Sequence, residues 1–199
     1  MNDVTPTDVG HRNRRLNDTR NPPRPRRCVG CGALQHVERK TVMYPESGLP
    51  NVQLVNVPVW ICSNGHEEVE VSAVTELHEL LAHMIIRKPA LLQGSEIRFL
   101  RRRGELSAKE FAGRIGISSQ HLSRLENDKN KSKILDLLIR LALATLIAAR
   151  DGKSFPADLV PLVDQLDAAW DIGTYRLKHI DHAHPEHEWE EAKPTRAVQ

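Results

Sequence analysis

The sequence predicts an α+β fold in which a small α/β domain, stabilised by a metal ion, precedes an all-α domain. Residues 28–70 contain short β-type stretches between turn residues, whereas residues 95–150 place apolar side chains at helical spacing. Cys28 and Cys31 stand at the start of the β-rich part with the two-residue spacing of a metal-binding knuckle. Because only 4% of the residues are aromatic, both cores must consist mainly of aliphatic side chains.

Composition divides the chain into four parts. Residues 1–27 are rich in Arg, Asn and Pro and have little to bury, so we expect a disordered basic tail. The α/β domain then spans residues 28–90, and the all-α domain spans residues 94–150. Residues 151–199 are expected to form a helical extension, with an amphipathic segment over 156–170, and a loose acidic tail.

Capping residues bound the expected helices. Ser95 and either Ser118 or Ser119 are candidate N-caps. Ser107, with Glu110 three residues later, has the spacing of a capping box. We therefore expect strands over 41–44, 52–61 and 67–71, and helices over 72–87, 95–103, 107–116, 118–127 and 133–150.

The net charge of +2 conceals basic and acidic blocks. Residues 95–133 carry ten Lys or Arg against five Asp or Glu, whereas residues 151–199 carry five against ten. Such segregation suits a protein that contacts a polyanion with a chosen surface, although chance clustering would give the same counts.

Several classes of protein are disfavoured by what the sequence lacks. The longest apolar run, residues 141–149, is far shorter than the ~18 residues that a membrane span needs. The first residues lack the basic and apolar regions of a secretory signal. No Ser-His-Asp arrangement, P-loop or glycine-rich dinucleotide turn is present, so we expect a cytoplasmic, non-enzymatic protein without a membrane partner.

Two short helices joined by a turn at Gly116 indicate a helix-turn-helix, whose second helix enters the major groove of double-stranded DNA. On that helix Gln120 can pair with adenine and Arg124 with guanine. A helical hairpin without a DNA role would not need this density of basic residues. The expected inward residues are Phe111, Ala112, Ile115, Ile117, Leu122 and Leu125. The expected DNA contacts are Ser119, Gln120, Ser123 and Arg124 for bases, and Lys129, Lys131 and Lys133 for phosphates.

Three segments form a wider pattern: Leu-Ser-Ala-Lys-Glu-Phe-Ala at 106–112, Gly-Ile-Ser at 116–118 and Leu-Ser-Arg-Leu-Glu-Asn at 122–127. With them, residues 97–140 resemble the Cro/cI-type (XRE) family of DNA-binding domains, which have an all-α, lambda-repressor-like fold. The resemblance implies that Ser119, Gln120 and Arg124 read bases, and that Ser107, Asn127 and Lys129 lie against phosphates.

Two residues depart from the family pattern. Ala108 stands where a DNA-contacting Gln is common, so that contact is expected to be missing. Asp128 replaces a frequent Gly; it tolerates the left-handed backbone conformation but adds a negative charge near the DNA backbone.

A second pair of metal ligands is expected after the strand that ends at Ile61. Cys62 opens it, but Gly65 occupies the place of a fourth cysteine, so His66 is the expected fourth ligand. His36, five residues after Cys31, is the alternative. A structural Zn²⁺ would stabilise a domain of about 60 residues with a thin core. Its expected ligands are Cys28, Cys31, Cys62 and His66.

The order of these parts looks like that of the MqsA/YgiT-type zinc-finger antitoxin regulators, and the likeness spans about residues 28–145. In that family the zinc domain is structural and can bind a toxin, while the helix-turn-helix domain dimerises on a palindrome and represses its own operon. The resemblance implies a sequence-specific transcriptional regulator that acts as a homodimer and autorepressor. The alternative is an antitoxin whose zinc domain neutralises a small cognate toxin.

Two further features concern assembly and metal binding. The leucine-rich helix over 134–147 is either a dimer face or the last core helix of its domain, and both roles are compatible. The histidine-rich segment near the end of the chain is expected to be a solvated tail rather than a second metal site. Its histidines are His179, His182, His184 and His187.

Overall fold

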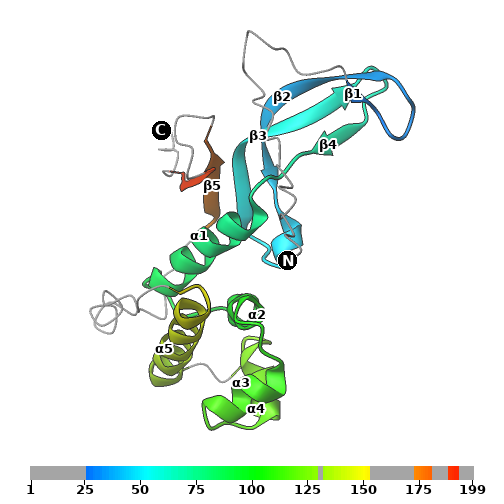
Figure 1. The fold of residues 1–199 in the computed structure, drawn as a ribbon. Coiled ribbons are helices and arrows are strands. Elements are labelled where there is room, and N and C mark those ends of the chain that lie inside the picture. The colour runs from blue at the N-terminus through cyan, green and yellow to red at the C-terminus, as the bar shows by residue number, and fades with distance from the viewer. Residues whose placement is uncertain (1–25, 130–131, 153–172, 181–187, 193–199) are drawn as a thin grey trace, which may run out of the picture.

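The computed structural model describes residues 26–129, 132–152, 173–180 and 188–192. The expected N-terminal tail up to residue 25 and the amphipathic segment over 156–170 lie outside the described residues. The described chain is an α+β protein, with a sheet region formed by strands between residues 26 and 69 and helices after it (Figure 1). The predicted fold class is confirmed.

A six-stranded sheet forms one end of the molecule. Its order is β1-β2-β3-β5-β6, and β4 also pairs with β3. All pairs are antiparallel except β3 with β5. A short 3-10 helix, η1 (Pro45–Ser47), connects β2 to β3. The strands are β1 (Arg26–Arg27), β2 (Leu34–Met43), β3 (Val52–Cys62), β4 (Glu67–Val69), β5 (Tyr175–His179) and β6 (Trp189–Glu191).

β3 occupies the middle of the sheet because it is the most apolar strand. Val52, Leu54, Val57 and Val59 are fully buried on it. The register between β2 and β3 shifts between Lys40 and Val42 on β2, opposite the left-handed residue Asn56 on β3 (φ 63°). This bulge lets both ends of a long strand bury valines although the strand bends in the middle.

The expectation that about the last 20 residues form a loose tail is wrong for the strand Trp189–Glu191, and the strand before it, Tyr175–His179, was not expected. β5 runs parallel to β3, with Val52 opposite Tyr175 and Leu54 opposite Leu177. The side chains of Tyr175, Leu177 and His179 are buried. His179 is therefore part of the sheet and not of a solvated tail, while His182, His184 and His187 lie outside the described residues.

Five helices follow the expected pattern: α1 (Val74–Arg87), α2 (Gly94–Arg103), α3 (Ala108–Arg114), α4 (Ser119–Leu125) and α5 (Lys133–Arg150). The N-cap of α2 is Gln93, not Ser95, because Gln93 and Glu96 form a capping box with each other's backbone N–H groups. Ser107 and Ser118 cap α3 and α4 as expected. Among the residues that the structure describes, none of the helices combines the length and hydropathy of a membrane-spanning segment.

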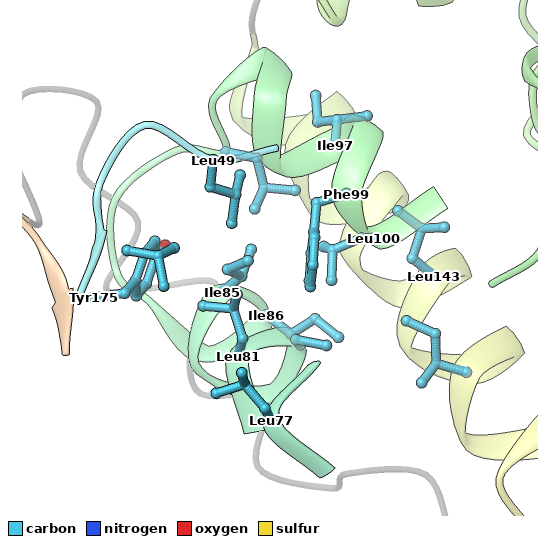
Figure 2. Close-up of a cluster of buried hydrophobic side chains, with 14 of the residues drawn as sticks. Leu49, Leu77, Leu81, Ile85, Ile86, Ile97, Phe99, Leu100, Leu143 and Tyr175 are labelled. Carbon is cyan, nitrogen blue, oxygen red and sulfur yellow. The ribbon is translucent and has the colours of Figure 1, made fainter. Parts of the chain in front are cut away.

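The apolar core is continuous from the sheet to the helices. In Figure 1, α1 lies between the sheet and the pair α2 and α5. Leu77, Leu81 and Ile85 of α1 are fully buried and lie in the same apolar cluster as Leu100 of α2 and Leu143 of α5 (Figure 2). Helices and sheet therefore share one packed interior, which fixes their relative orientation.

A buried guanidinium ties α5 to the connection between α1 and α2. Arg140 is 1% exposed and forms an ion pair with Asp136, one turn earlier, at 2.6 Å. Its remaining N–H groups donate to the carbonyls of Ile85, Ile86, Lys88 and Ala90. The charge is neutralised and its donors are used, so this contact keeps α5 in one position against α1.

A second buried contact joins the C-terminal strand to the helices. Glu96, at the start of α2, is fully buried and pairs with Lys88. Its other carboxylate oxygen accepts a hydrogen bond of 2.6 Å from the hydroxyl of Tyr175 on β5. Burial and the neighbouring carboxylate raise the pKa of Tyr175, so the phenol stays protonated and continues to donate.

Candidate functional site

The α3–turn–α4 unit has the geometry of a helix-turn-helix. The Ser107 hydroxyl oxygen accepts the N–H of Glu110, and the Glu110 carboxylate accepts the N–H of Ser107. Hydrogen bonding with the Ser107 side chain, and next with its backbone N–H, lowers the pKa of Glu110. Gly116 makes the turn at φ 73°, a conformation that glycine adopts without strain. Of the six predicted inward residues, Phe111, Ala112, Leu122 and Leu125 are buried in the apolar core. Ile115 and Ile117 are partly buried and pack against it.

The outer face of α4 consists of exposed polar side chains. Ser119, Gln120, Ser123 and Arg124 are all exposed. None of these four side chains is engaged in a hydrogen bond or ion pair with another residue that the structure describes. Their donors and acceptors are therefore available to an external partner.

The predicted phosphate contacts lie beside this face. Ser107 is exposed at the start of α3, where its hydroxyl oxygen caps the helix. Asn127 donates one amide hydrogen to the carbonyl of Ser123 at 2.7 Å and keeps the other. Lys129 is exposed, and Lys131 lies outside the described residues.

Much of the basic block before α3 is engaged inside the protein. Arg101 is 8% exposed and donates to both carboxylate oxygens of Glu126, at 2.7 and 3.2 Å. Arg98 donates to the same carboxylate and to the Glu126 carbonyl. Arg103 pairs with Glu79 and Asp151. The charge count alone therefore overstates the surface that this block offers to a polyanion, since these arginines hold α2 against the end of α4 and against α1.

The turn after α4 depends on Asp128 and on a close approach by Gly94. Asp128 has φ 62°, and its carboxylate accepts the N–H of Gly94 at 2.8 Å. The negative charge is thus directed at the N-terminus of α2, where the helix dipole favours it. A Cβ atom on Gly94 would overlap the backbone carbonyl of Glu126. These two residues set the distance between α2 and the end of α4.

The predicted metal ligands come together at the far end of the sheet from the helices. The ligand atoms of Cys28, Cys31, Cys62 and His66 all lie within 4.8 Å of one another. The Cys31 and Cys62 sulfurs are 3.7 Å apart, and Nδ1 of His66 is 3.5 Å from the Cys28 sulfur. Tetrahedral zinc with ordinary bond lengths requires about 3.8 Å between sulfurs and about 3.6 Å between sulfur and nitrogen. The cluster could therefore hold a metal ion.

Two tight turns present these ligands. In the first, the N–H of Gly32 donates to the carbonyl of Cys28 at 2.8 Å. In the second, the N–H of Gly65 donates to the carbonyl of Cys62 at 2.9 Å. Gly65 has φ 79°, so the position where a fourth cysteine was expected is a left-handed turn residue, and the side chain after it supplies the ligand.

The pKa values of two of the thiols are shifted in opposite directions. A hydrogen bond from the Ala33 N–H lowers the pKa of Cys31, whereas burial raises the pKa of Cys28. His36 does not belong to the cluster; its Nε2 lies 3.2 Å from the Glu38 carboxylate instead. The alternative that His36 is the fourth ligand is therefore wrong.

Comparison with known families agrees with the geometry of the helical part. Residues 97–144 match a family model described as Helix-turn-helix. This XRE-type match runs from α2 into α5 and supports a DNA-binding regulator, a family that is typically non-enzymatic. Searches of curated proteins and of solved structures found no match to the chain. The likeness to the MqsA/YgiT-type regulators, which includes the zinc region, stays a prediction.

Proposed function

We propose that the protein is a sequence-specific transcriptional regulator whose helix α4 enters the DNA major groove. The observation that carries this proposal is the contrast between the two faces of α4: its apolar face is buried, whereas its polar face is exposed and unengaged. An α-helix with this contrast fits the groove, and its side chains reach base edges. The proposed base contacts are Ser119, Gln120, Ser123 and Arg124.

Contacts to phosphates would orient this helix. Ser107 lies at the start of α3, while Asn127 and Lys129 follow α4, so the two groups flank the proposed reading face. Lys131 is proposed as a further phosphate contact from the sequence. Contacts of this kind supply affinity that falls with salt concentration and carries little sequence information.

A second copy of the chain is the proposed partner on DNA. Ile134 is 84% exposed and Leu138 is 42% exposed, one turn apart on the same face of α5. Burying this apolar stripe against its symmetry mate would form a twofold dimer. Such a dimer would place two α4 helices about 34 Å apart on a palindromic operator. Bound at its own promoter in the cytoplasm, the dimer would act as an autorepressor.

Zn²⁺ is the proposed occupant of the four-ligand cluster. Three thiolates and one imidazole form a complete tetrahedral set with no open coordination position, which is typical of structural sites. The metal would hold the β1–β2 turn against the β3–β4 turn, where few apolar side chains are buried.

The decisive experiment titrates the purified protein against its own upstream DNA and a scrambled control at near-physiological salt. We expect binding to the upstream fragment at least about a thousandfold tighter than to the control, with two chains per site. Equal and weak binding to both fragments would contradict the proposal, because the exposed face of α4 would then serve no base-reading role.

The antitoxin alternative rests on the resemblance alone. It requires a small toxin that binds the zinc region, and co-expression with the product of a neighbouring toxin-like gene tests it. A stable complex that survives gel filtration would support it, and separate elution of the two proteins would contradict it.

A further inference from the structure

A pocket of about 330 Å³ lies where the loop after β2 meets α1 and α2. η1 and Gly48 form one wall, and His78 of α1 and Phe99 of α2 form the apolar part, with their rings 5.7 Å apart in an edge-on arrangement. The size is at the lower end of the range for small-molecule sites, which begins at about 300 Å³. The pocket is therefore large enough for a small metabolite.

Guanidinium groups dominate the polar part of this pocket. Arg98, Arg102, Arg103 and Arg150 all line it, together with the hydroxyl of Ser95. Arg102 is exposed, and its side chain forms no hydrogen bond or ion pair with any residue that the structure describes. A free guanidinium and a serine hydroxyl that line the same pocket are both hydrogen-bond donors of the kind that an oxyanion accepts.

A buried donor on the same wall lacks an acceptor. The Arg103 side chain is only 9% exposed, and its terminal nitrogen pairs with Glu79 and Asp151. Its Nε is buried and has no hydrogen-bond partner among the described residues. A buried donor without an acceptor destabilises the folded state, because its lost hydration is not replaced by a hydrogen bond. An oxyanion in the pocket would supply one after a small shift of this side chain.

Two glutamates at the pocket limit what the ligand can be. Glu46 and Glu105 also line it and would repel a ligand that carries only negative groups. They would instead accept hydrogen bonds from hydroxyl or amino groups. Burial lowers the pKa of His78, which leaves its ring neutral at pH 7.

We propose that this pocket binds a small organic oxyanion, a carboxylate or a phosphate that also carries hydrogen-bond donors, and that its occupancy weakens DNA binding. This inference rests on the proposed function. Arg98 connects the two sites, because it lines the pocket and also donates to the side chain and carbonyl of Glu126 at the end of α4. An anion that draws Arg98 toward the pocket weakens the contact that holds the end of α4 against α2.

Anion binding is tested first without DNA, on the full zinc-loaded chain. Glycerol 3-phosphate and malate, which each carry an oxyanion and a hydroxyl donor, are the probes, titrated by calorimetry at an ionic strength held constant with chloride. We expect millimolar or tighter binding of at least one probe, weakened at least tenfold in Arg102→Gln. Arg87→Gln is the matched control, since Arg87 is exposed on α1 and lines a different pocket, and it should bind like the wild type. Absence of binding, or equal weakening in both variants, would overturn the proposal.

The effect on DNA is tested separately with the operator fragment. Saturating probe should raise the dissociation constant for the operator about tenfold, and operator DNA should weaken probe binding by the same factor. Arg102→Gln should remove this response while leaving operator affinity without the probe unchanged. If Arg102→Gln itself weakens operator binding, Arg102 is a DNA-phosphate contact and the proposal fails. If the chain shows no operator selectivity, the proposed function fails, while the titration without DNA still decides whether the pocket binds anions.

Discussion

The end of the sheet that carries the four candidate metal ligands, here the knuckle end, exposes apolar side chains beside them, whereas the helix-turn-helix at the helical end buries the apolar residues of its inner face. Val29 is 91% exposed and Leu34 is 57% exposed, beside Cys28 and Cys31. In the helix-turn-helix, Phe111 and Leu122 are fully buried. The first region lacks the apolar burial that keeps the second folded, so the proposed metal ion would take its place through coordination bonds. With the metal bound, the protein would use two different means of stabilisation.

Metal removal should destabilise the knuckle end and leave the helical end folded. We expect this effect to be the largest of those predicted here. Structural zinc sites contribute an apparent free energy of about 10–16 kcal/mol, far more than any single contact here. In Cys28→Ser, or after chelation, we expect backbone amides in β1, β4 and the knuckle turns to lose protection from hydrogen exchange. Amides in α5 should keep it.

His36→Gln is the matched control for this prediction. His36 is exposed on β2 and lies outside the ligand cluster, so the variant should retain one zinc per chain and wild-type protection. Unchanged protection in metal-free protein would show that the knuckle end is held by packing after all.

Gly94→Ala should damage the helical end alone. The added methyl group would overlap the Glu126 carbonyl, so α2 and the end of α4 must separate. We expect a loss of about 3 kcal/mol in the free energy of unfolding, measured by denaturant titration. Gly113→Ala on α3 is the control, because no atom lies within 4 Å of its added Cβ, and it should be neutral or stabilising. Equal stability of the two variants would rule out the close approach.

Arg124→Ala should change DNA recognition without changing the stability of the knuckle end or of the helical end. Its side chain is exposed and unengaged, so the melting temperature should match that of the wild type. Binding to the cognate operator should weaken by about 1–3 kcal/mol, and preference at one base position should relax. Equal losses on cognate and random DNA, measured by fluorescence anisotropy, would remove Arg124 from the base-reading set.

Lys129→Ala should have the smallest effect. Losing one phosphate contact should weaken cognate and random DNA alike and reduce the slope of log affinity against log salt by about 1. A loss confined to the cognate operator would instead assign Lys129 to base reading.

Local signals predicted the helical end well. Caps such as Ser107 and Ser118, and the glycine at 116, act within a few residues, so their consequences can be read from the sequence. The spacing of Cys28, Cys31, Cys62 and His66 likewise predicted that these candidate ligands come together, although it left His36 open as an alternative to His66.

Contacts between segments that are distant in the chain were not predicted from the sequence. The alternation in Tyr175, Leu177 and His179 is a strand signal, but its parallel partner lies in β3, and no local pattern identifies it. Arg101 was expected on a basic face of its helix, yet it stands one turn after the buried Ile97 and is buried against Glu126. A charge count over residues 95–133 does not reveal such burial, because it does not say which faces of the helices the charges occupy.

The parallel pairing of β3 with β5 also dictates an order of folding. Val52 and Tyr175 are neighbours in the sheet, yet the whole helix-turn-helix lies between them in the chain. Closing so long a loop is slow, whereas α2 to α5 require mainly short-range contacts. During synthesis on a ribosome, the helices can assemble while the sheet still lacks its last two strands. A stop codon just after α5 would therefore leave β3 with an unpaired edge, which is a site for aggregation.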